Sequence, residues 1–101
     1  MEYFTYLYET IKIDMKTFND LEFKDMDFFY GGVQARIEFP NGYGASVVKH
    51  KFSYGGEDGL YELAVTKDND LHYDNPVAGG DVRGHLSEEE VTELLEQIQQ
   101  L

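Results

Sequence analysis

The sequence has no cysteine and no long apolar run, and each absence excludes a class of protein. Without cysteine, the chain of 101 residues can form no disulfide framework, offers no thiolate nucleophile and has no cysteine ligands for a zinc or iron–sulfur centre. No apolar stretch approaches the roughly 20 residues that a membrane-spanning helix needs, and residues 1–9 lack the basic and apolar regions of a signal peptide. We therefore expect a cytoplasmic protein that does not engage a membrane.

Basic residues are also scarce, since 8 lysines and arginines stand against 20 acidic residues and give a formal net charge of -12. Lysine and arginine contacts to phosphate provide much of the affinity of proteins for nucleic acids, and an acidic surface repels phosphates and anionic lipids. The charge therefore predicts no direct binding to nucleic acid. Two explanations stay open: the acidity serves only solubility, or an acidic face docks on a basic partner protein where nucleic acid would otherwise bind.

Length and composition favour one folded domain, comprising residues 1–101. Single domains commonly hold about 100–150 residues, so a second core would be too small to be stable alone. Hydrophobic residues make up 42% of the chain and charged residues 28%, which are ordinary globular proportions and argue against disorder. The 8 tyrosines and 7 phenylalanines supply large apolar areas for that core.

Alternation of apolar and polar side chains predicts an antiparallel sheet. The clearest stretch is 33–39, in which every second side chain is apolar. The Asn41-Gly42 pair behind it favours a type I′ turn, so a returning strand is expected over residues 44–50. The pattern near the start also fits helical spacing over residues 2–9, which leaves a helix there as an alternative. The other predicted strands are at residues 3–13, 20–24, 60–66 and 71–73.

A C-terminal helix over residues 88–100 is predicted by its cap and its apolar stripe. Ser87 and Glu90 match the Ser-x-x-Glu capping box, in which each side chain satisfies the other residue's backbone N–H. Apolar residues follow at helical spacing and should pack across the sheet: Val91, Leu94, Leu95, Ile98 and Leu101. The predicted fold is therefore α+β, with an antiparallel sheet of about four or five strands packed by a C-terminal helix.

The residue patterns that accompany catalysis or cofactor binding do not occur. The three histidines are not spaced as metal ligands, the serines lack a nucleophile elbow, and the glycine pairs match no phosphate-binding loop. The acidic stretch after residue 67 departs from a calcium loop, because His72 falls on a ligand position and no glycine follows it. We predict a non-enzymatic protein with no catalytic residue, metal or cofactor. A small enzyme or ligand site using His72, Tyr73 and Asp74 is a further alternative.

Tyrosines beside the predicted turns are candidates for protein binding. Tyrosine on a loop offers a large contact area and a hydroxyl group at low entropic cost. With nearby carboxylates, such tyrosines would form an acidic and aromatic rim suited to a basic protein surface; the candidate residues are Tyr43, Tyr54, Asp58, Asp70, Tyr73 and Asp74. In the alternative interpretation the rings fold back over the edge of the sheet.

Four strings in the chain together resemble a group of small phage and prophage proteins of unknown function. They are NGYGASVV, GLYELAV, LHYDNP and LSEEEV, which begin at Asn41, Gly59, Leu71 and Leu86. The resemblance covers roughly residues 31–101 and leaves residues 1–30 without a counterpart. It implies the product of a phage or mobile element that acts in the cytoplasm of a bacterial host cell, and it implies no catalytic residue.

Size, charge and this resemblance lead to a functional hypothesis. The favoured function is a non-enzymatic binding protein that modulates, for example by inhibition, a host or phage protein such as a nucleic-acid-handling or defence enzyme. The alternative is a structural or accessory domain whose acidity serves only solubility. Such a domain would form a homodimer through an open sheet edge or exposed aromatic residues.

Overall fold

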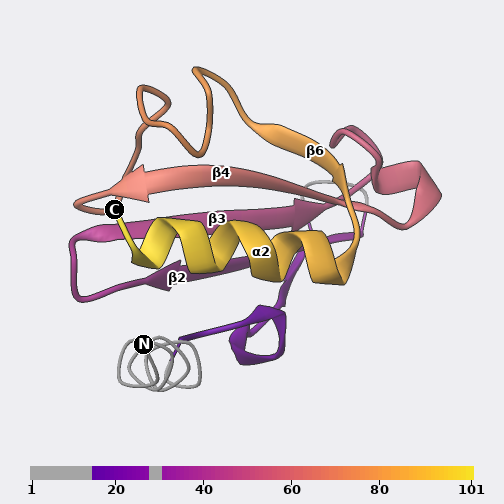
Figure 1. The fold of residues 1–101 in the computed structure, drawn as a ribbon. Coiled ribbons are helices and arrows are strands. Elements are labelled where there is room, and N and C mark those ends of the chain that lie inside the picture. Colours follow the sequence, from indigo (N-terminus) through magenta and orange to yellow (C-terminus); the bar gives the residue numbers. More distant parts are fainter. Residues whose placement is uncertain (1–14, 28–30) are drawn as a thin grey trace, which may run out of the picture.

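The structure, a computed structural model, describes residues 15–27 and 31–101. In this part of the chain a sheet of six antiparallel strands carries one α-helix on one face (Figure 1), which confirms the predicted α+β fold. The strands follow one another as a meander, and only β6 returns to pair with β4. In chain order the elements are the 3-10 helix η1 (Phe18–Asp20), β1 (Lys24–Met26), β2 (Gly32–Glu38), β3 (Tyr43–Lys49), the 3-10 helix η2 (Gly56–Asp58), β4 (Tyr61–Lys67), β5 (Asp70–Leu71), β6 (Arg83–Leu86) and α2 (Glu88–Gln99).

The β2–β3 hairpin follows the predicted alternation, with each strand shifted by one residue from the predicted range. Ala35 lies opposite Val47 and Ile37 opposite Ala45, which places apolar side chains together on one face. The hairpin loop is longer than two residues, because the ladder closes with the N–H of Phe39 bonded to the carbonyl of Tyr43. Pro40, which has no backbone N–H, therefore lies in the loop, where the ladder requires no donor.

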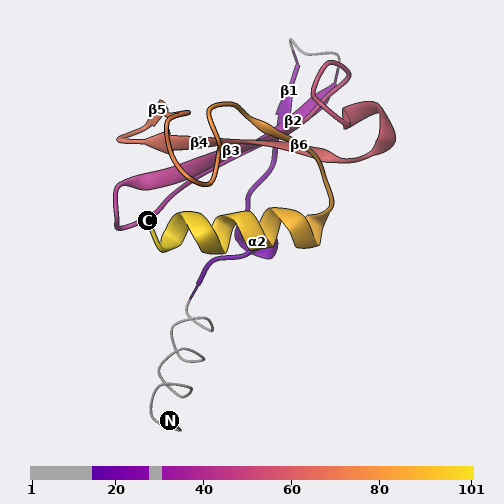
Figure 2. The ribbon, with the colours of Figure 1, turned by 45° about the horizontal axis from the view of Figure 1, so that its top comes forward.

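The core lies between α2 and the adjacent face of the sheet, while the described part of the chain places no helix on the other face (Figure 2). Alternate residues of β3 and β4 meet the apolar stripe of the helix, as the sequence predicted. Burial is complete at the centre of this contact, and the fully buried side chains there include Val47, Leu63, Val65, Val91, Leu95 and Ile98. The predicted helix ends one residue early, and Leu101 is exposed.

The predicted strand at residues 20–24 is wrong, and its apolar residues have another role. η1 ends at Asp20, residues 21–23 are irregular, and the chain becomes a strand only at Lys24. Phe18 donates its backbone N–H to Thr92 of α2, and its ring lies 5.1 Å from that of Tyr61 and 5.6 Å from that of Phe23. The alternation therefore reflects packing of this segment along the side of the core rather than strand pairing.

The remaining predicted elements agree with the structure to different degrees. The strand predicted at 60–66 is β4, one residue later, and the strand predicted at 71–73 is β5 at 70–71. β6 was missed, because Arg-Gly-His-Leu has no alternation and His85 takes a positive φ of 56°. The strand at 3–13 and the alternative helix at 2–9 lie outside the described residues. None of the helices formed by residues 15–27 and 31–101 is long and apolar enough to cross a membrane.

Candidate interaction surface

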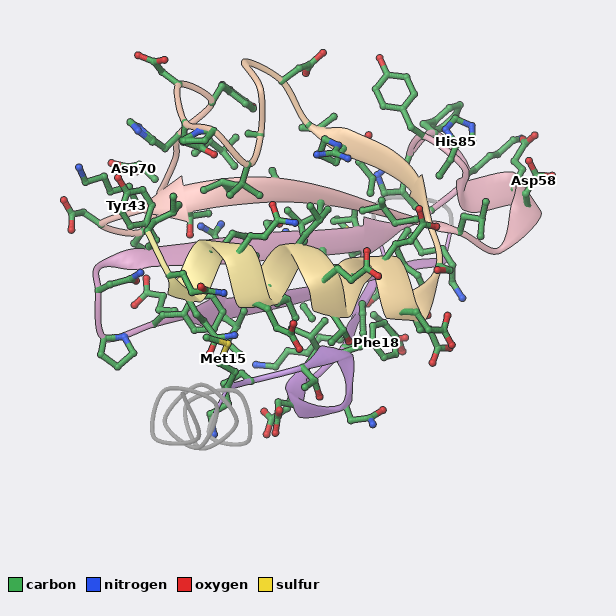
Figure 3. All side chains as sticks on the ribbon, in the orientation of Figure 1. Met15, Phe18, Tyr43, Asp58, Asp70 and His85 are labelled. Carbon is green, nitrogen blue, oxygen red and sulfur yellow. The ribbon has the colours of Figure 1, made fainter. Side chains whose placement is uncertain are left out.

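The structure divides the six predicted binding residues between opposite ends of the sheet. Tyr43 and Asp70 lie at the end where β4 turns into β5, whereas Asp58 lies at the other end, near His85 (Figure 3). Tyr54 belongs to the second group, because its carbonyl accepts a hydrogen bond from the N–H of His85. The seven residues of β4 separate the two groups by about 20 Å. Each end therefore has to be judged as a separate surface.

The β4–β5 turn is a tight hairpin whose shape follows from its two central residues. Lys67 pairs with Asp70, which leaves only Asp68 and Asn69 in the loop, with φ values of 51° and 71°. Two successive positive φ angles define a type I′ turn, and Asp and Asn tolerate this conformation better than most residues. Asp68, Asn69 and Asp70 are all exposed. The turn thus projects two carboxylates from the end of the sheet.

Hydrogen bonds attach this turn to its neighbours. The N–H of Asp68 donates to the carbonyl of Gly42 at 2.9 Å, which joins the β4–β5 turn to the β2–β3 loop. The guanidinium group of Arg36 donates to the carbonyl of Asn69 at 3.0 Å. The side-chain amide of Asn41 in turn donates to the carbonyl of Ile98 at 2.9 Å, near the end of α2. The turn is therefore held in place by the sheet and, through the β2–β3 loop, by the helix.

Tyr43 supports this end of the molecule rather than projecting from it. Its side chain is half-buried, and its ring lies edge-on to that of His72, with 6.1 Å between ring centroids. The ammonium group of Lys67 lies 5.2 Å from the centre of the tyrosine ring, within the range of a cation–π contact. Of the two interpretations of the loop tyrosines, the one in which the ring folds back over the sheet describes Tyr43.

The loop after β5 is fixed by Asn75. Its side-chain carbonyl accepts hydrogen bonds from the N–H groups of Val77 and Ala78 at 3.0 and 2.7 Å, and its amide donates to the carbonyl of His72 at 2.7 Å. Val77 and Ala78 are buried in the core, which anchors the loop from the inside. The carbonyl of Tyr73 accepts from two further backbone N–H groups, each at 3.0 Å. The backbone that carries Tyr73 is therefore well fixed.

Two large apolar side chains are nevertheless exposed on this fixed backbone. Leu71 exposes 53% of its surface and Tyr73 exposes 40%, and both Asp70 and Asp74 beside them are exposed. We call this region, made of Asp68, Asp70, Leu71, Tyr73 and Asp74, the β4–β5 surface. Exposed apolar groups bordered by charged residues are typical of sites that dock another molecule.

Sequence reasoning missed Leu71 as a member of this surface. The sequence predicts Leu71 only as part of a short strand. The two-residue turn places it opposite Thr66, on the face of the sheet that lacks the helix. The signal in the sequence was the Asp68-Asn69 pair, because a two-residue turn fixes the register of every residue that follows.

The opposite end of the sheet is built around the β3–β4 loop, residues 50–60. Tyr54 exposes 59% of its surface, while its N–H donates to a carboxylate oxygen of Glu62 at 3.3 Å. Its Cβ packs so closely on Gly84 that any larger residue there would overlap it. Asp58 is exposed in η2, between the positive-φ glycines Gly55 and Gly59. This end presents a tyrosine and a carboxylate apart from the β4–β5 surface.

The histidines are also divided between the two ends. His50 and His85 border the β3–β4 loop, whereas His72 contacts Tyr43. Within residues 15–27 and 31–101 no three histidine or acidic side chains gather closely enough to hold a metal ion. In the group of His72, Tyr73 and Asp74, the His72 ring packs on Tyr43, while Tyr73 and Asp74 are exposed.

Comparison of the chain with protein-family models, with curated proteins and with solved structures finds no match. The comparisons therefore add nothing to the functional argument, which starts from the surfaces of this chain.

Proposed function

We propose that this chain is a non-enzymatic protein that binds and modulates a partner protein through the β4–β5 surface. In the setting that the resemblance to small phage proteins implies, the partner is a host or phage protein, such as a nucleic-acid-handling or defence enzyme. The observation that carries the proposal is the exposure of Leu71 and Tyr73 on a backbone fixed by Asn75.

The fixed backbone favours binding because little conformational entropy remains to be lost. A partner that covers Leu71 and Tyr73 would gain from the removal of apolar surface from water, at about 25 cal/mol per Å². The loop backbone is already held by hydrogen bonds from Asn75 and Gly80, so binding does not have to order it. A small surface of this kind is suited to act as the central anchor of an interface.

The charges around the anchor indicate the chemistry of the partner. Asp68, Asp70 and Asp74 are all exposed at the same end of the sheet, and the net charge of the chain is -12. Carboxylates at the rim of an interface mainly accelerate association with a surface of opposite charge, and salt screens this effect. The expected partner therefore has a basic surface, as a nucleic-acid-binding protein does.

The alternative function, a structural or accessory domain, is favoured by a different observation. Acidic residues are not confined to the β4–β5 surface, since α2 alone carries five glutamates and no basic residue. A charge spread over the whole molecule is what solubility requires. The two functions make different predictions: substitution of single residues in the β4–β5 surface changes binding to a partner only under the first.

The deciding experiment compares the two ends of the sheet. Wild type and the Tyr73→Ala and Tyr54→Ala variants are used as bait in a bacterial lysate, and each captured protein is then studied with purified components. We expect Tyr73→Ala to raise the dissociation rate, by roughly tenfold or more if Tyr73 is a hot spot, and Tyr54→Ala to leave it unchanged. Charge reversal at Asp70 should slow association and weaken its salt dependence, whereas reversal at Asp58 should not.

Added duplex DNA tests the nature of the partner. If the partner uses the same basic surface for nucleic acid, the duplex should displace the protein. Binding that is insensitive to salt and to all four substitutions would contradict the proposal and favour the structural alternative.

A further inference from the structure

One edge of the sheet ends in a short stretch of strand that pairs with no other strand in the part of the chain that the structure describes. β1 pairs only with residues Gly32–Gln34, whereas β2 continues to Glu38. Within residues 15–27 and 31–101 no strand pairs with residues 35–38 on that side. The unpaired stretch of β2 is therefore bounded by β1 before residue 35 and by Pro40 after residue 38, where the chain turns away.

The hydrogen bonds of the hairpin show which backbone groups this edge presents. The N–H of Phe39 bonds to Tyr43 of β3, and the direction of the backbone groups alternates along an antiparallel strand. Odd-numbered residues of β2 therefore bond to β3, and even-numbered residues face the edge. Gln34 is paired with Lys24 of β1. Arg36 and Glu38 thus present the N–H and carbonyl groups that a further strand would bond.

The unpaired stretch of β2 begins beside a shallow hollow. The hollow of about 280 Å³ lies at β1 and the residues just before it, and it is lined by Glu22, Lys24, Asp25, Met26, Gln34 and Arg36. Arg36 and Glu38 are exposed, and Ile37 between them is half-buried on the opposite face of the strand. A strand added here would extend the sheet in line with β1.

We infer that the strand that adds here is β2 of a second copy of this chain, running antiparallel about a two-fold axis at Ile37. In this register Arg36 of each copy lies opposite Glu38 of the other. Each such pair exchanges both of its backbone hydrogen bonds and places opposite charges side by side on the same face of the sheet. Ile37 meets its own counterpart across the axis.

The residues along the edge are compatible with this register and disfavour the two registers next to it, in which the axis lies at Arg36 or at Glu38. An axis at Arg36 would place the two arginines opposite each other and would direct Glu38 to Gln34, which Lys24 already occupies. An axis at Glu38 would place two carboxylates together and set Arg36 opposite Pro40, which has no N–H. Like charges directly opposite each other oppose pairing, so the charges of Arg36 and Glu38 select a single arrangement.

The present contact of Arg36 does not prevent this pairing. Its guanidinium group donates to the carbonyl of Asn69, and that bond is exposed to solvent. A guanidinium group has five N–H donors, and a bond to a carboxylate is stronger than one to a neutral carbonyl. Arg36 therefore exchanges one solvent-exposed partner for a charged one when the second copy arrives.

This inference goes beyond the proposed function and can fail independently of it. The sheet order places β2 and β5 on different sides of the central β3–β4 pair. Pairing through β2 therefore leaves Leu71 and Tyr73 uncovered, and the dimer presents them twice. The β4–β5 turn gives up its bond from Arg36 and keeps the one from the N–H of Asp68 to Gly42. A partner with two matching sites would then be held by avidity as well as by the individual contacts.

The first test is a charge exchange followed by mass measurement of the full chain. Wild type should associate to twice the subunit mass of 11.6 kDa in light scattering or sedimentation. Glu38→Arg alone places arginine opposite arginine, and Arg36→Glu alone places glutamate opposite glutamate, so each variant should be monomeric. A mixture of the two restores both pairs and should give a mixed dimer. Glu93→Arg, which makes the same charge change on α2, should dimerise as wild type does.

The second test uses the absence of cysteine from the chain. Across the axis, the Cα atoms of residue 37 would be about 4.5 Å apart, within the range that a disulfide can bridge. Ile37→Cys should therefore form a covalent dimer under mild oxidation, and Arg36→Cys, displaced from its counterpart along the strand, should not. A wild-type protein that stays monomeric at every concentration overturns the inference, as does a dimer that keeps its mass in both single charge variants.

Discussion

The two ends of the sheet are held together by different means. At the β4–β5 end, side-chain amides fix the turns: Asn41 bonds the end of α2, and Asn75 holds the loop that carries Tyr73. At the opposite end, side chains also fix the β3–β4 loop, since Ser53 bonds the backbone of His50 and Glu62 accepts from the N–H of Tyr54. This loop adds close contacts at glycine, such as that of Gly56 with the carbonyl of His50. A Cβ added at the glycines in the loops at the β4–β5 end, Gly42, Gly79 and Gly80, would make no contact closer than 3.5 Å. These loops can therefore change their exposed residues while keeping their shape, which suits a specific binding surface.

The largest effect that would test this comparison is expected at the β3–β4 loop. A methyl group at residue 56 would overlap the carbonyl oxygen of His50 and lie 2.5 Å from the hydroxyl of Ser53. Gly56→Ala should therefore lower the free energy of unfolding by about 2–3 kcal/mol, measured by urea denaturation. Gly59→Ala is the matched control, since nothing lies within 4 Å and only its φ of 77° opposes the change, at about 1 kcal/mol. Equal losses in the two variants would contradict the steric argument.

A smaller loss is expected at the β4–β5 end. Asn75→Ala removes the acceptor for the N–H groups of two buried residues, Val77 and Ala78, which should cost about 2 kcal/mol. It should also weaken any complex made through Tyr73, because the loop is no longer fixed before binding. Asn75→Asp keeps the acceptor and loses only the bond to His72, so its loss should be smaller. If Asn75→Ala were as stable as wild type, the loop would have to be held by Val77 and Ala78 alone.

The smallest effects compare the two ends of α2. Ser87 accepts a hydrogen bond from the N–H of Glu90 at 3.2 Å, and Ser87→Ala should cost about 1 kcal/mol. Asn41→Ala removes the bond to Ile98 at the other end and should also cost about 1 kcal/mol. Because the two sites share no partner, the double variant should lose the sum of the two values. A clear departure from additivity would mean that the ends of the helix are coupled.

The sequence predicted those parts of the fold in which local pattern and packing agree. Ala35 and Ile37 alternate with polar residues because one face of β2 is core and the other is solvent. Ser87 and Glu90 form the predicted capping box because this motif depends only on residues within one turn. At η1 the local pattern and the packing disagree. The pattern predicts a strand, but Phe18 and Phe23 are placed by contact with the ring of Tyr61, which is distant in the sequence.

The candidate surface was predictable only in part, for a related reason. Tyr73, Asp70 and Asp74 were found because they flank a turn that the sequence displays. Whether a turn tyrosine is exposed depends on its neighbours in space, and Tyr43 is half-buried because His72 and Lys67 contact its ring. No local pattern reports which end of the sheet a loop occupies, so the distance between Tyr54 and Tyr73 became apparent only in the structure.

The position of β4 has a consequence for local opening of the protein. β4 is bonded to β3 along one edge, and to β6 and β5 along the two halves of the other. Strands on both sides therefore oppose the opening of β4, whereas β1 pairs only with β2 among residues 15–27 and 31–101. Amide hydrogen exchange should therefore be slowest in β4 and fastest in β1. On this argument, β4 is the last strand of the sheet to open.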